Sequence, residues 1–333
     1  MNKLSQFRLL FAMIILLGLG SWGFLVHKTI HQISAYALPK KLSTFFMKNE
    51  DYMVYNSVRP DVRRNTDKTE APKHFIDLDA PIFGKEPLKE IPQDWDSAVK
   101  KYSADTLKKY GTVPWVIVEV QEKLTNAFRN KMKDSILFYA ADLGHYISDA
   151  HVPLHTSYNY DGQLTNQKGL HALWETGVPE LNLESYNLYT KHKAKYIKNP
   201  LAEIWKEIKE TNQLLDGVFK EEINASVGFT EDKKFKRSER FGQMRKNFSP
   251  EFVKAYGERL GNTVNERLLA SSRCTADFWY TAWVNGGKPD LSDLENTSKE
   301  DKAKFKAAIK AWKKNELIKQ ELLQARKGKK EEL

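Results

Sequence analysis

The sequence predicts an all-α protein: a compact, multi-helix single domain with long active-site loops and a C-terminal helical extension. Apolar residues recur at helical spacing along most of the 333 residues, and clear alternating strands are missing. Proline and glycine gather in connections near residues 50–95 and 152–170, where we expect the long loops. A chain of this length can bury a large core, and its hydrophobic fraction of 41% is that of an ordinary soluble protein.

Four stripes of mainly apolar residues predict the main helices, because their members recur on one face at helical spacing. In chain order the stripes are Phe24, His27, Ile30, Ile33 and Ala37; Trp115, Ile117, Val118, Val120, Leu124 and Phe128; Ile136, Leu137, Ala140, Leu143 and Ile147; and Phe252, Ala255, Leu260, Val264 and Leu268. The third stripe leads directly into His145 and Asp149. The strongly basic segment 231–245 is expected to be exposed.

The composition of the two chain ends divides the sequence into three segments. Residues 1–21 combine a charged start, an apolar run and a small-residue exit, which is typical of a signal peptide. An uncleaved anchor is the alternative, because Leu19 is bulkier than the ideal residue two before Ser21. Residues 22–290 form the main domain. Residues 291–333 form a charged, lysine-rich helical extension, for which contact with a membrane surface is the alternative role.

Charge and cysteine content limit the partners and the kind of site. The formal charge of +10 favours anionic partners such as nucleic acid, phospholipid headgroups or cell-surface polymers, although lysine-rich surfaces also serve solubility. No obligate protein partner is evident from the sequence. Cys274 is the only cysteine, so it forms no intramolecular disulfide, and we interpret it as a small buried hydrophobe rather than a reactive thiol. A zinc site must therefore use histidine and carboxylate ligands.

The stretch from His145 to Glu175 holds five candidate metal ligands. His145 and Asp149 are four residues apart, as are His171 and Glu175, and this spacing places two side chains on one face of a helix. His155 lies between the two pairs, and half of the chain's eight histidines fall in this stretch. The upstream candidates are Trp22, whose α-amine and carbonyl become available if cleavage follows Ser21, and His27, Asp61 and His74.

Four segments that contain these residues resemble motifs of one superfamily, the zinc-dependent phospholipases C and the zinc-dependent single-strand nucleases. The segments are WGFLVH, HFID, HYISDAHVPLH and GLHALWE. The resemblance implies that residues 22–290 form a zinc-dependent phosphodiesterase domain with three zinc ions. The implied ligands are Asp61, His74 and His145 for the first ion; the Trp22 amine and carbonyl with His27 for the second; Asp149 as a bridge between these two; and His155, His171 and Glu175 for the third.

Charge explains what such a site would do. A phosphodiester is anionic, and two cations a few ångströms apart can share one water, lower its pKa towards ~7 and direct it at phosphorus. The third ion can neutralise a non-bridging oxygen and the departing oxyanion. The expected function is hydrolysis of phosphoric ester bonds by an exported enzyme, periplasmic or extracellular. Asp61 and Asp149 would be its catalytic residues, and Asp61 could be either a ligand or a general base.

Features of two substrate classes are present. Three features resemble the phospholipase branch. They are Glu175, where nucleases usually carry Asp; the 16-residue step from His155 to His171; and the lack of paired cysteines. A phospholipase C-like phosphodiesterase is therefore the first interpretation. A zinc-stabilised, secreted binding protein without turnover is the alternative from another class.

The nuclease branch is the second interpretation, with a single-strand endonuclease or nucleotidase as the expected activity. The WG pair close to His27, and HFID with Phe75 and Asp77, resemble this branch, in which residues after the histidine help to hold a base. Phe75 and Asp77 are therefore candidate substrate-binding residues. The alternatives are core packing for Phe75, and for Asp77 either a cap on the following turn or a carboxylate behind a metal ligand.

Three further histidines are not required by the motifs. We interpret His31 as a helix-surface residue or as one that contacts a ligand. His151 is either a solvated loop residue or one that orients a neighbour, and His192, among lysines, is expected to be solvated.

Overall fold

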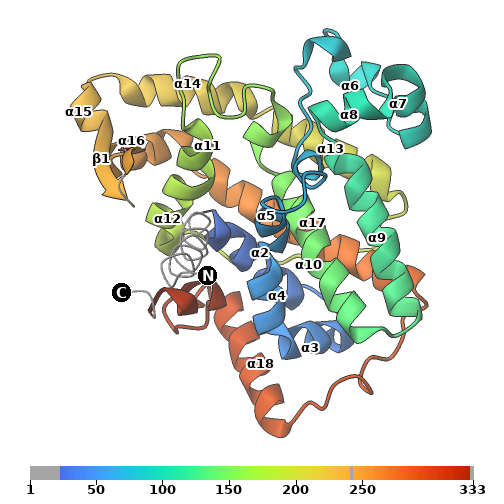
Figure 1. Ribbon diagram of the computed structural model, residues 1–333. Helices are drawn as coiled ribbons and strands as arrows, with labels where there is room; N and C mark the ends of the chain where they lie inside the picture. Colours follow the sequence, from blue (N-terminus) through green and yellow to red (C-terminus); the bar gives the residue numbers. More distant parts are fainter. Residues whose placement is uncertain (1–22, 241–242, 331–333) are drawn as a thin grey trace, which may run out of the picture.

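Four helices form the centre of the structure, a computed structural model that describes residues 23–240 and 243–330. They are α2 (Phe24–Tyr36), α9 (Val113–Arg129), α10 (Lys133–Asp149) and α17 (Thr263–Asn285), and each contacts at least two of the others (Figure 1). The first three predicted stripes lie on α2, α9 and α10. The prediction of an all-α protein is confirmed, with one small exception described below.

Shorter elements surround this centre. The helices are α3 (Lys40–Lys48), α4 (Glu50–Asn56), α5 (Arg59–Arg63), α6 (Pro87–Glu90), α7 (Trp95–Tyr102), α8 (Ala104–Tyr110), α11 (Leu170–Ala172), α12 (Val178–Asn182), α13 (Pro200–Asn212), α14 (Leu215–Ser226), α15 (Glu231–Lys234), α16 (Pro250–Leu260) and α18 (Lys299–Lys313). The tight 3-10 turns are η1 (Ala71–His74), η2 (Pro81–Phe83), η3 (Pro153–Thr156), η5 (Leu183–Ser185) and η6 (Gln324–Lys330), and η4 (Leu173–Gly177) is a wider π-helical turn. The expected long loops are therefore interrupted by short helices.

Several helices begin where the sequence offers a cap. The Asn199 side chain accepts a hydrogen bond from the Ala202 N–H at 3.1 Å, and Pro200 follows at the first helical position of α13. Ser298 starts α18 with a reciprocal capping box that includes Asp301. Such caps satisfy backbone donors that have no partner inside the helix.

Aromatic side chains pack between the central helices. Trp279 of α17 is fully buried and stacks on Phe46, with ring centroids 4.7 Å apart. Its Nε1 donates a hydrogen bond to the Ala140 carbonyl of α10 at 2.9 Å. Burial of an apolar side chain of this size stabilises a fold by about 1.5–3 kcal/mol, and the hydrogen bond satisfies the one polar atom of the indole. The indole therefore links α17 to the helix that carries His145.

His31 joins α2 to α10. Its ring is fully buried, with Nε2 2.9 Å from the Ala141 carbonyl oxygen and Nδ1 2.8 Å from the His27 carbonyl oxygen. Burial lowers the pKa of His31 to about 4, although the two backbone hydrogen bonds act against this shift. The ring occupies the space above Gly144, where a Cβ atom would lie 2.5 Å from His31 Nε2. The interpretation of His31 as a helix-surface residue is wrong.

The prediction that strands are missing is wrong for one segment. Strands β1 (Phe235–Arg240) and β2 (Gln243–Phe248) form an antiparallel hairpin within the exposed basic region. Charged residues occupy both strands, so the sequence lacks the apolar alternation that marks a half-buried strand. The paired residues Phe235 and Phe248 anchor the hairpin, with rings 4.8 Å apart, and Phe248 stacks on Phe252 of α16.

One other expectation needs adjustment. The last predicted stripe is divided between α16 and α17, because Gly261 adopts a φ of +57° and ends α16. The extension after residue 291 packs on the central body: Trp312 is buried and donates to the Leu188 carbonyl at 2.6 Å, and the Gln324 N–H donates to Gln32 of α2. Among the described helices, none has the length and apolarity needed to cross a membrane.

The contact between His31 and Gly144 gives a stability prediction. Gly144→Ala places a methyl group against a ring that cannot move freely, and overpacking of this kind costs about 1–3 kcal/mol. We expect a lower free energy of unfolding, measured by urea denaturation at fixed zinc concentration. Gly217→Ala in α14 is the matched control, because its Cβ would meet nothing within 4 Å, and we expect it to be neutral or stabilising. Equal stability of the two variants would contradict the role given to His31.

Candidate metal centre

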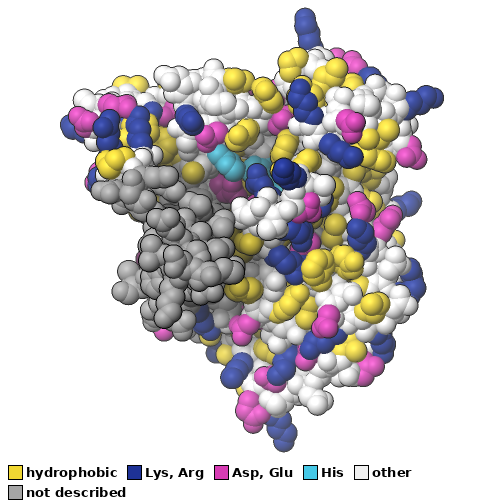
Figure 2. Space-filling view, in the orientation of Figure 1, with side chains coloured by type: hydrophobic (Ala, Val, Ile, Leu, Met, Phe, Trp, Pro, Cys, Tyr) yellow, Lys and Arg dark blue, Asp and Glu magenta, His cyan; other side chains and the backbone are white. Residues whose placement is uncertain are grey.

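Eight of the nine predicted ligand residues bring their side chains together. The ninth, Trp22, lies outside the described residues. Three sets of residues could each hold a metal ion, because the possible ligand atoms inside each set lie within 4.8 Å of one another. The sets are His27, His145 and Asp149; Asp61, His74 and His145; and His155, His171 and Glu175. Figure 2 shows histidine side chains in a hollow on one face of the molecule, with Lys and Arg side chains close by. Gly23, the first described residue, lies beside this cluster: a Cβ there would be 3.9 Å from Glu175 Oε1.

Asp149 stands between the first two sets. Its Oδ2 lies 2.9 Å from His74 Nδ1 and 3.3 Å from His145 Nε2. Its other oxygen, Oδ1, lies 3.6 Å from His27 Nε2 and 3.7 Å from His155 Nδ1. The carboxylate is almost completely buried at the C-terminal end of α10. Its two oxygens therefore face different groups of histidines, as a carboxylate that bridges two cations would.

The third set comes from the turn η3, which carries His155, and from the adjoining α11 and η4, which carry His171 and Glu175. His155 Nε2 lies 2.8 Å from His171 Nε2, and His171 Nε2 lies 2.8 Å from Glu175 Oε2. The predicted helical pair falls on α11 and on η4, a π-helical turn that contains Glu175. Single π-turns of this kind are frequent at functional sites. Glu175 Oε1 also lies 3.4 Å from His27 Nε2, so the third set touches the set that contains His27.

Backbone hydrogen bonds bring the sets together. The Ile76 N–H donates to the His155 carbonyl at 2.9 Å, and the Leu78 N–H donates to the Thr156 carbonyl at 3.1 Å. His155 Nδ1 donates to the His74 carbonyl at 2.9 Å, which leaves Nε2 directed at His171 and Glu175. His145 Nδ1 donates to the Ser57 carbonyl at 2.8 Å and leaves its Nε2 on the Asp149 side. A carbonyl that holds one ring nitrogen fixes the tautomer and directs the other nitrogen towards a ligand.

The charges in the cluster depend on one another. Burial by itself would raise the pKa of Asp149, but His145, His155 and His74 hold it well below its usual value. Burial likewise opposes ionisation of Glu175, and His171 is foremost among the histidines that lower its pKa. Burial opposes protonation of His74, yet the hydrogen bond with Asp149 and the nearby Glu70 carboxylate raise its pKa to about 9. Protons on the histidines thus balance the carboxylates, and a divalent cation that binds here must displace them.

The donor set fits zinc. Five imidazoles and three carboxylates contribute to the three sets, and they include no thiolate, since Cys274 lies elsewhere in the structure. Imidazole with carboxylate is a set that zinc accepts while keeping a position for water. Magnesium and calcium prefer sites built mainly from oxygen.

A charged network behind His74 was not predicted from the sequence. Glu70 is fully buried, and Arg63 donates to its carboxylate through both Nε and Nη2 at 2.9 Å. Lys73 and the Tyr146 hydroxyl donate to the same carboxylate. Glu70 Oε1 also lies 3.6 Å from His74 Nε2, on the side of the ring that faces away from Asp149. The Glu70 carboxylate therefore holds the ring from behind, as carboxylates do for many metal-binding histidines.

Asp142 extends this network along α10. It accepts hydrogen bonds from Arg59 and from Arg63, which flank Asp61 in α5. Asp142 comes one turn before Tyr146 on α10, whose hydroxyl meets Glu70. The repeat of charged and polar residues at Asp142, Tyr146 and Asp149 was the only sequence signal, and it resembles an ordinary polar helix face.

Phe75 and Asp77 lie directly beside the cluster. Phe75 is half-buried, and its carbonyl accepts a hydrogen bond from Val113. Asp77 is buried, and burial, together with the nearby charge of Asp79, raises its pKa to about 7. Asp79 caps the turn at residues 157–158 by accepting hydrogen bonds from Ser157 and Tyr158.

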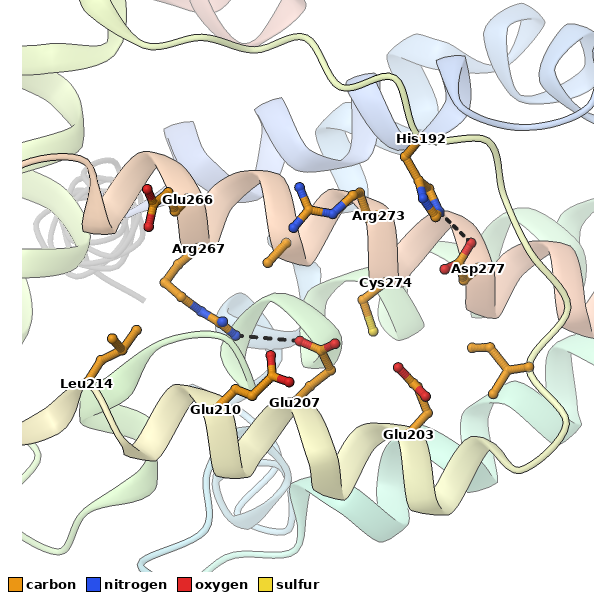
Figure 3. A pocket seen from close by; sticks show the side chains of 12 residues that line it. His192, Glu203, Glu207, Glu210, Leu214, Glu266, Arg267, Arg273, Cys274 and Asp277 are labelled. Carbon is orange, nitrogen blue, oxygen red and sulfur yellow. Dashed lines mark hydrogen bonds and ion pairs between the residues drawn. The ribbon is translucent and has the colours of Figure 1, made fainter.

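Two other histidine interpretations need correction: His192 lines a separate cavity, and His151 contacts Glu207, which lines the same cavity. The cavity has a volume of about 440 Å³ between α13 and α17, and Figure 3 shows its lining. His192 is not solvated, because its Nε2 lies 2.7 Å from Asp277. His151 is not a solvated loop residue either: it is buried 3.1 Å from Glu207, which also meets Arg267. None of the eight converging residues lines this cavity, and it holds no part of the metal centre.

The fold and the cluster together are those of an all-α, metal-dependent hydrolase. The family model of the S1/P1 nucleases matches residues 22–271, about three quarters of the chain, so the protein belongs to the S1/P1 nuclease family. A comparison with curated proteins found no match. The family is one of zinc-dependent phosphodiester hydrolases, and the superfamily prediction is confirmed. The match favours the nuclease interpretation over the phospholipase C interpretation, which the sequence analysis placed first.

The Glu70 contact predicts an effect on metal affinity. Glu70→Gln keeps the shape of the side chain but removes the charge behind His74, and we expect zinc affinity to fall about 10–100-fold. Competition with a calibrated chelator measures this. The control is Glu86→Gln, since Glu86 is exposed and its carboxylate pairs with no other residue than Lys89 among those described. Unchanged affinity in Glu70→Gln would show that the network does not support the metal site.

Proposed function

We propose that the protein is a zinc-dependent single-strand nuclease that cleaves phosphodiester bonds with three zinc ions. Asp61, His74 and His145 would hold the first ion. Trp22 and His27 would hold the second, and Asp149 would bridge the two. The third would be held by His155, His171 and Glu175. The membership of the S1/P1 nuclease family supports the substrate class.

One observation carries the proposal: the two oxygens of the buried Asp149 carboxylate face two different histidine sets. A structural ion pair needs only one such contact. A carboxylate so placed could bridge two adjacent cations, an arrangement that stabilises both the attacking and the leaving oxygen in hydrolysis of an anionic ester. The third set lies within reach, because Glu175 touches His27.

The residues of the site have separable roles. When bound, zinc supplies Lewis-acid charge that activates water and neutralises the phosphate. Asp61 is partly exposed, with its Oδ1 3.6 Å from His74 Nδ1, so it can act as a ligand or accept a proton from the attacking water. Arg64 lies 3.5 Å from Asp61, and its side chain is about half exposed, so its guanidinium can hold a phosphate oxygen.

Phe75 and Asp77 would hold a base next to the scissile bond. The partly exposed Phe75 ring offers a stacking surface, and such stacking is worth about 1–3 kcal/mol per base. The buried Asp77 carboxyl makes no ion pair in the described part of the chain, so it is free to meet a polar edge of a base. A phospholipid headgroup has no flat ring to use this surface.

Export and removal of residues 1–21 form part of the proposal. A free α-amine at residue 22 can ligate a metal, whereas a peptide nitrogen at the same position cannot. The position of Gly23 beside Glu175 supports a chain terminus at the cluster.

A substrate panel tests the activity. We expect purified mature protein to release 5′-nucleotides from single-stranded DNA and RNA. A chelator should abolish this activity and zinc should restore it, because the proposed hydrolysis depends on metal bound by the three ligand sets. Asp149→Asn should lower kcat at least about 100-fold, since it weakens the bridge between two sets. Release of diacylglycerol from phosphatidylcholine instead would select the phospholipase. No chelator-sensitive turnover on any substrate would favour a zinc-stabilised binding protein.

The role of the amino terminus gives a separate prediction. Protein that retains residues 1–21 should bind less zinc and be inactive, and proteolytic removal of those residues should restore both. Zinc content by elemental analysis and nuclease activity are measured on the same samples. Full activity in protein whose intact mass confirms an uncleaved leader would refute the proposal that the α-amine is a ligand.

A further inference from the structure

The β1–β2 hairpin is the most basic short segment beside the metal centre. Residues 231–248 carry seven Lys or Arg against three Asp or Glu. Figure 2 shows Lys and Arg side chains on the side of the molecule where Figure 1 places α15 and β1. The proposed catalytic chemistry does not use this segment.

The base of the hairpin is fixed to the loop that carries His171. The Phe248 ring lies against Gly169, where a Cβ would be 3.1 Å from the ring, and Gly169 comes two residues before His171. Gln167 of the same loop donates to Glu222 at 2.7 Å, and Lys234 at the start of the hairpin also pairs with Glu222. The hairpin therefore begins next to the third set of candidate ligands and is held there by packing and charge.

One face of the hairpin continues from this contact. Side chains of directly paired residues lie on the same face, and the face alternates along each strand. Phe235 and Phe248 pair at the base, and the next pair on their face is Arg237 with Lys246. Two like charges directly opposite one another destabilise a sheet. An anion that binds between them would remove this repulsion.

The partners of these cations differ. Lys246 pairs with Glu231 and lies over the Phe235 ring. Arg237 is exposed and has no ion pair or hydrogen bond from its side chain within the described part of the chain. Lys236 lies on the opposite face and pairs with Glu251 at 3.4 Å. Arg237 is thus a free guanidinium on the face that starts at the site.

We propose that Arg237 and Lys246 bind backbone phosphates of a single-stranded nucleic acid as it leaves the metal centre past His171. This inference rests on the proposed nuclease function and names the surface that holds the strand outside the reacting bond. The next pair on this face is Glu239 with Met244, so the cationic contact is confined to the pair of Arg237 and Lys246. A pair of cations that meets only phosphates gives affinity without sequence preference.

A lipid surface fits the hairpin less well. Contact with a membrane needs a broad apolar face next to the cations. Beyond the base of the hairpin, Met244 is the one exposed large apolar side chain that the described part of this segment presents. Binding to anionic vesicles is therefore the competing outcome of the experiment.

The test compares variants on the two faces in zinc-loaded mature protein. Arg237→Ser and the double variant Arg237→Ser/Lys246→Ser remove the cations of the proposed face, and Lys236→Ser is the matched control on the other face. Binding of a cleavage-resistant phosphorothioate oligonucleotide of about 20 nucleotides is measured from 50 to 200 mM salt. Each lost phosphate contact lowers the slope of log affinity against log salt by about 0.7, so we expect a decrease of about 0.7 in the single variant and about 1.4 in the double variant.

Activity on a small chromogenic phosphodiester separates the strand contact from damage to the site. We expect all three variants to hydrolyse it within about twofold of the parent protein, because this substrate cannot reach the hairpin. The KM for long single-stranded DNA should rise about tenfold in the double variant and stay within about twofold in Lys236→Ser.

Three results would overturn the inference: unchanged salt slopes in the double variant, equal losses in Lys236→Ser, or loss of binding to phosphatidylglycerol vesicles with oligonucleotide binding intact. The proposed function fails separately, if the parent protein does not cleave single-stranded DNA at all. In that case the oligonucleotide-binding comparison still decides whether Arg237 and Lys246 form a nucleic-acid surface.

Discussion

The buried carboxylate of Asp149 is the constraint on which the rest of the site depends. An ionised carboxylate inside a helical core is unfavourable unless positive charge surrounds it, and four histidines from different parts of the chain place ring nitrogens within 3.7 Å of its two oxygens. Asp149 ends α10, so the helix that forms the centre of the core also delivers the charge. The helix, the loops and the turn that carry the histidines must therefore meet at one point, and this requirement explains why short helical turns replace longer helices around the site.

A second layer of charge keeps the histidines in place. Glu70 stands behind His74, Arg63 of α5 connects Glu70 to Asp142 of α10, and Arg59 of α5 also pairs with Asp142. These contacts are buried or half-buried, so they are screened less by salt than surface ion pairs. On the other side of α10, His31 occupies the space that Gly144 leaves open and joins α2 to the helix that bears His145. Neither layer touches a substrate, yet both determine where the ligand atoms lie.

The sequence predicted the parts of this arrangement that local spacing controls. Helical periodicity located α2, α9 and α10, and the four-residue steps at His145 and His171 placed candidate ligands on common faces. It did not identify Glu70, Asp142 or Arg63, because their partners are distant in sequence and charged residues usually belong to a solvated face. For the same reason His192 was expected to be solvated, although Asp277 holds it. The hairpin was missed because its strands are charged on both faces, and the one pair of apolar residues in its described register is Phe235 with Phe248.

Substrate choice was the weakest inference from the sequence, and the structure explains why. The features that suggested a phospholipase, Glu175 and the step from His155 to His171, belong to the third ligand set. That set would neutralise charge on any phosphodiester, so its composition does not separate a lipid headgroup from a nucleotide. Groups that could make the distinction lie outside the ligand sets: the Phe75 ring, the Asp77 carboxyl and the basic hairpin face. A metal cluster determines which bond is broken, whereas the surface within about 20 Å of it determines which polymer is presented.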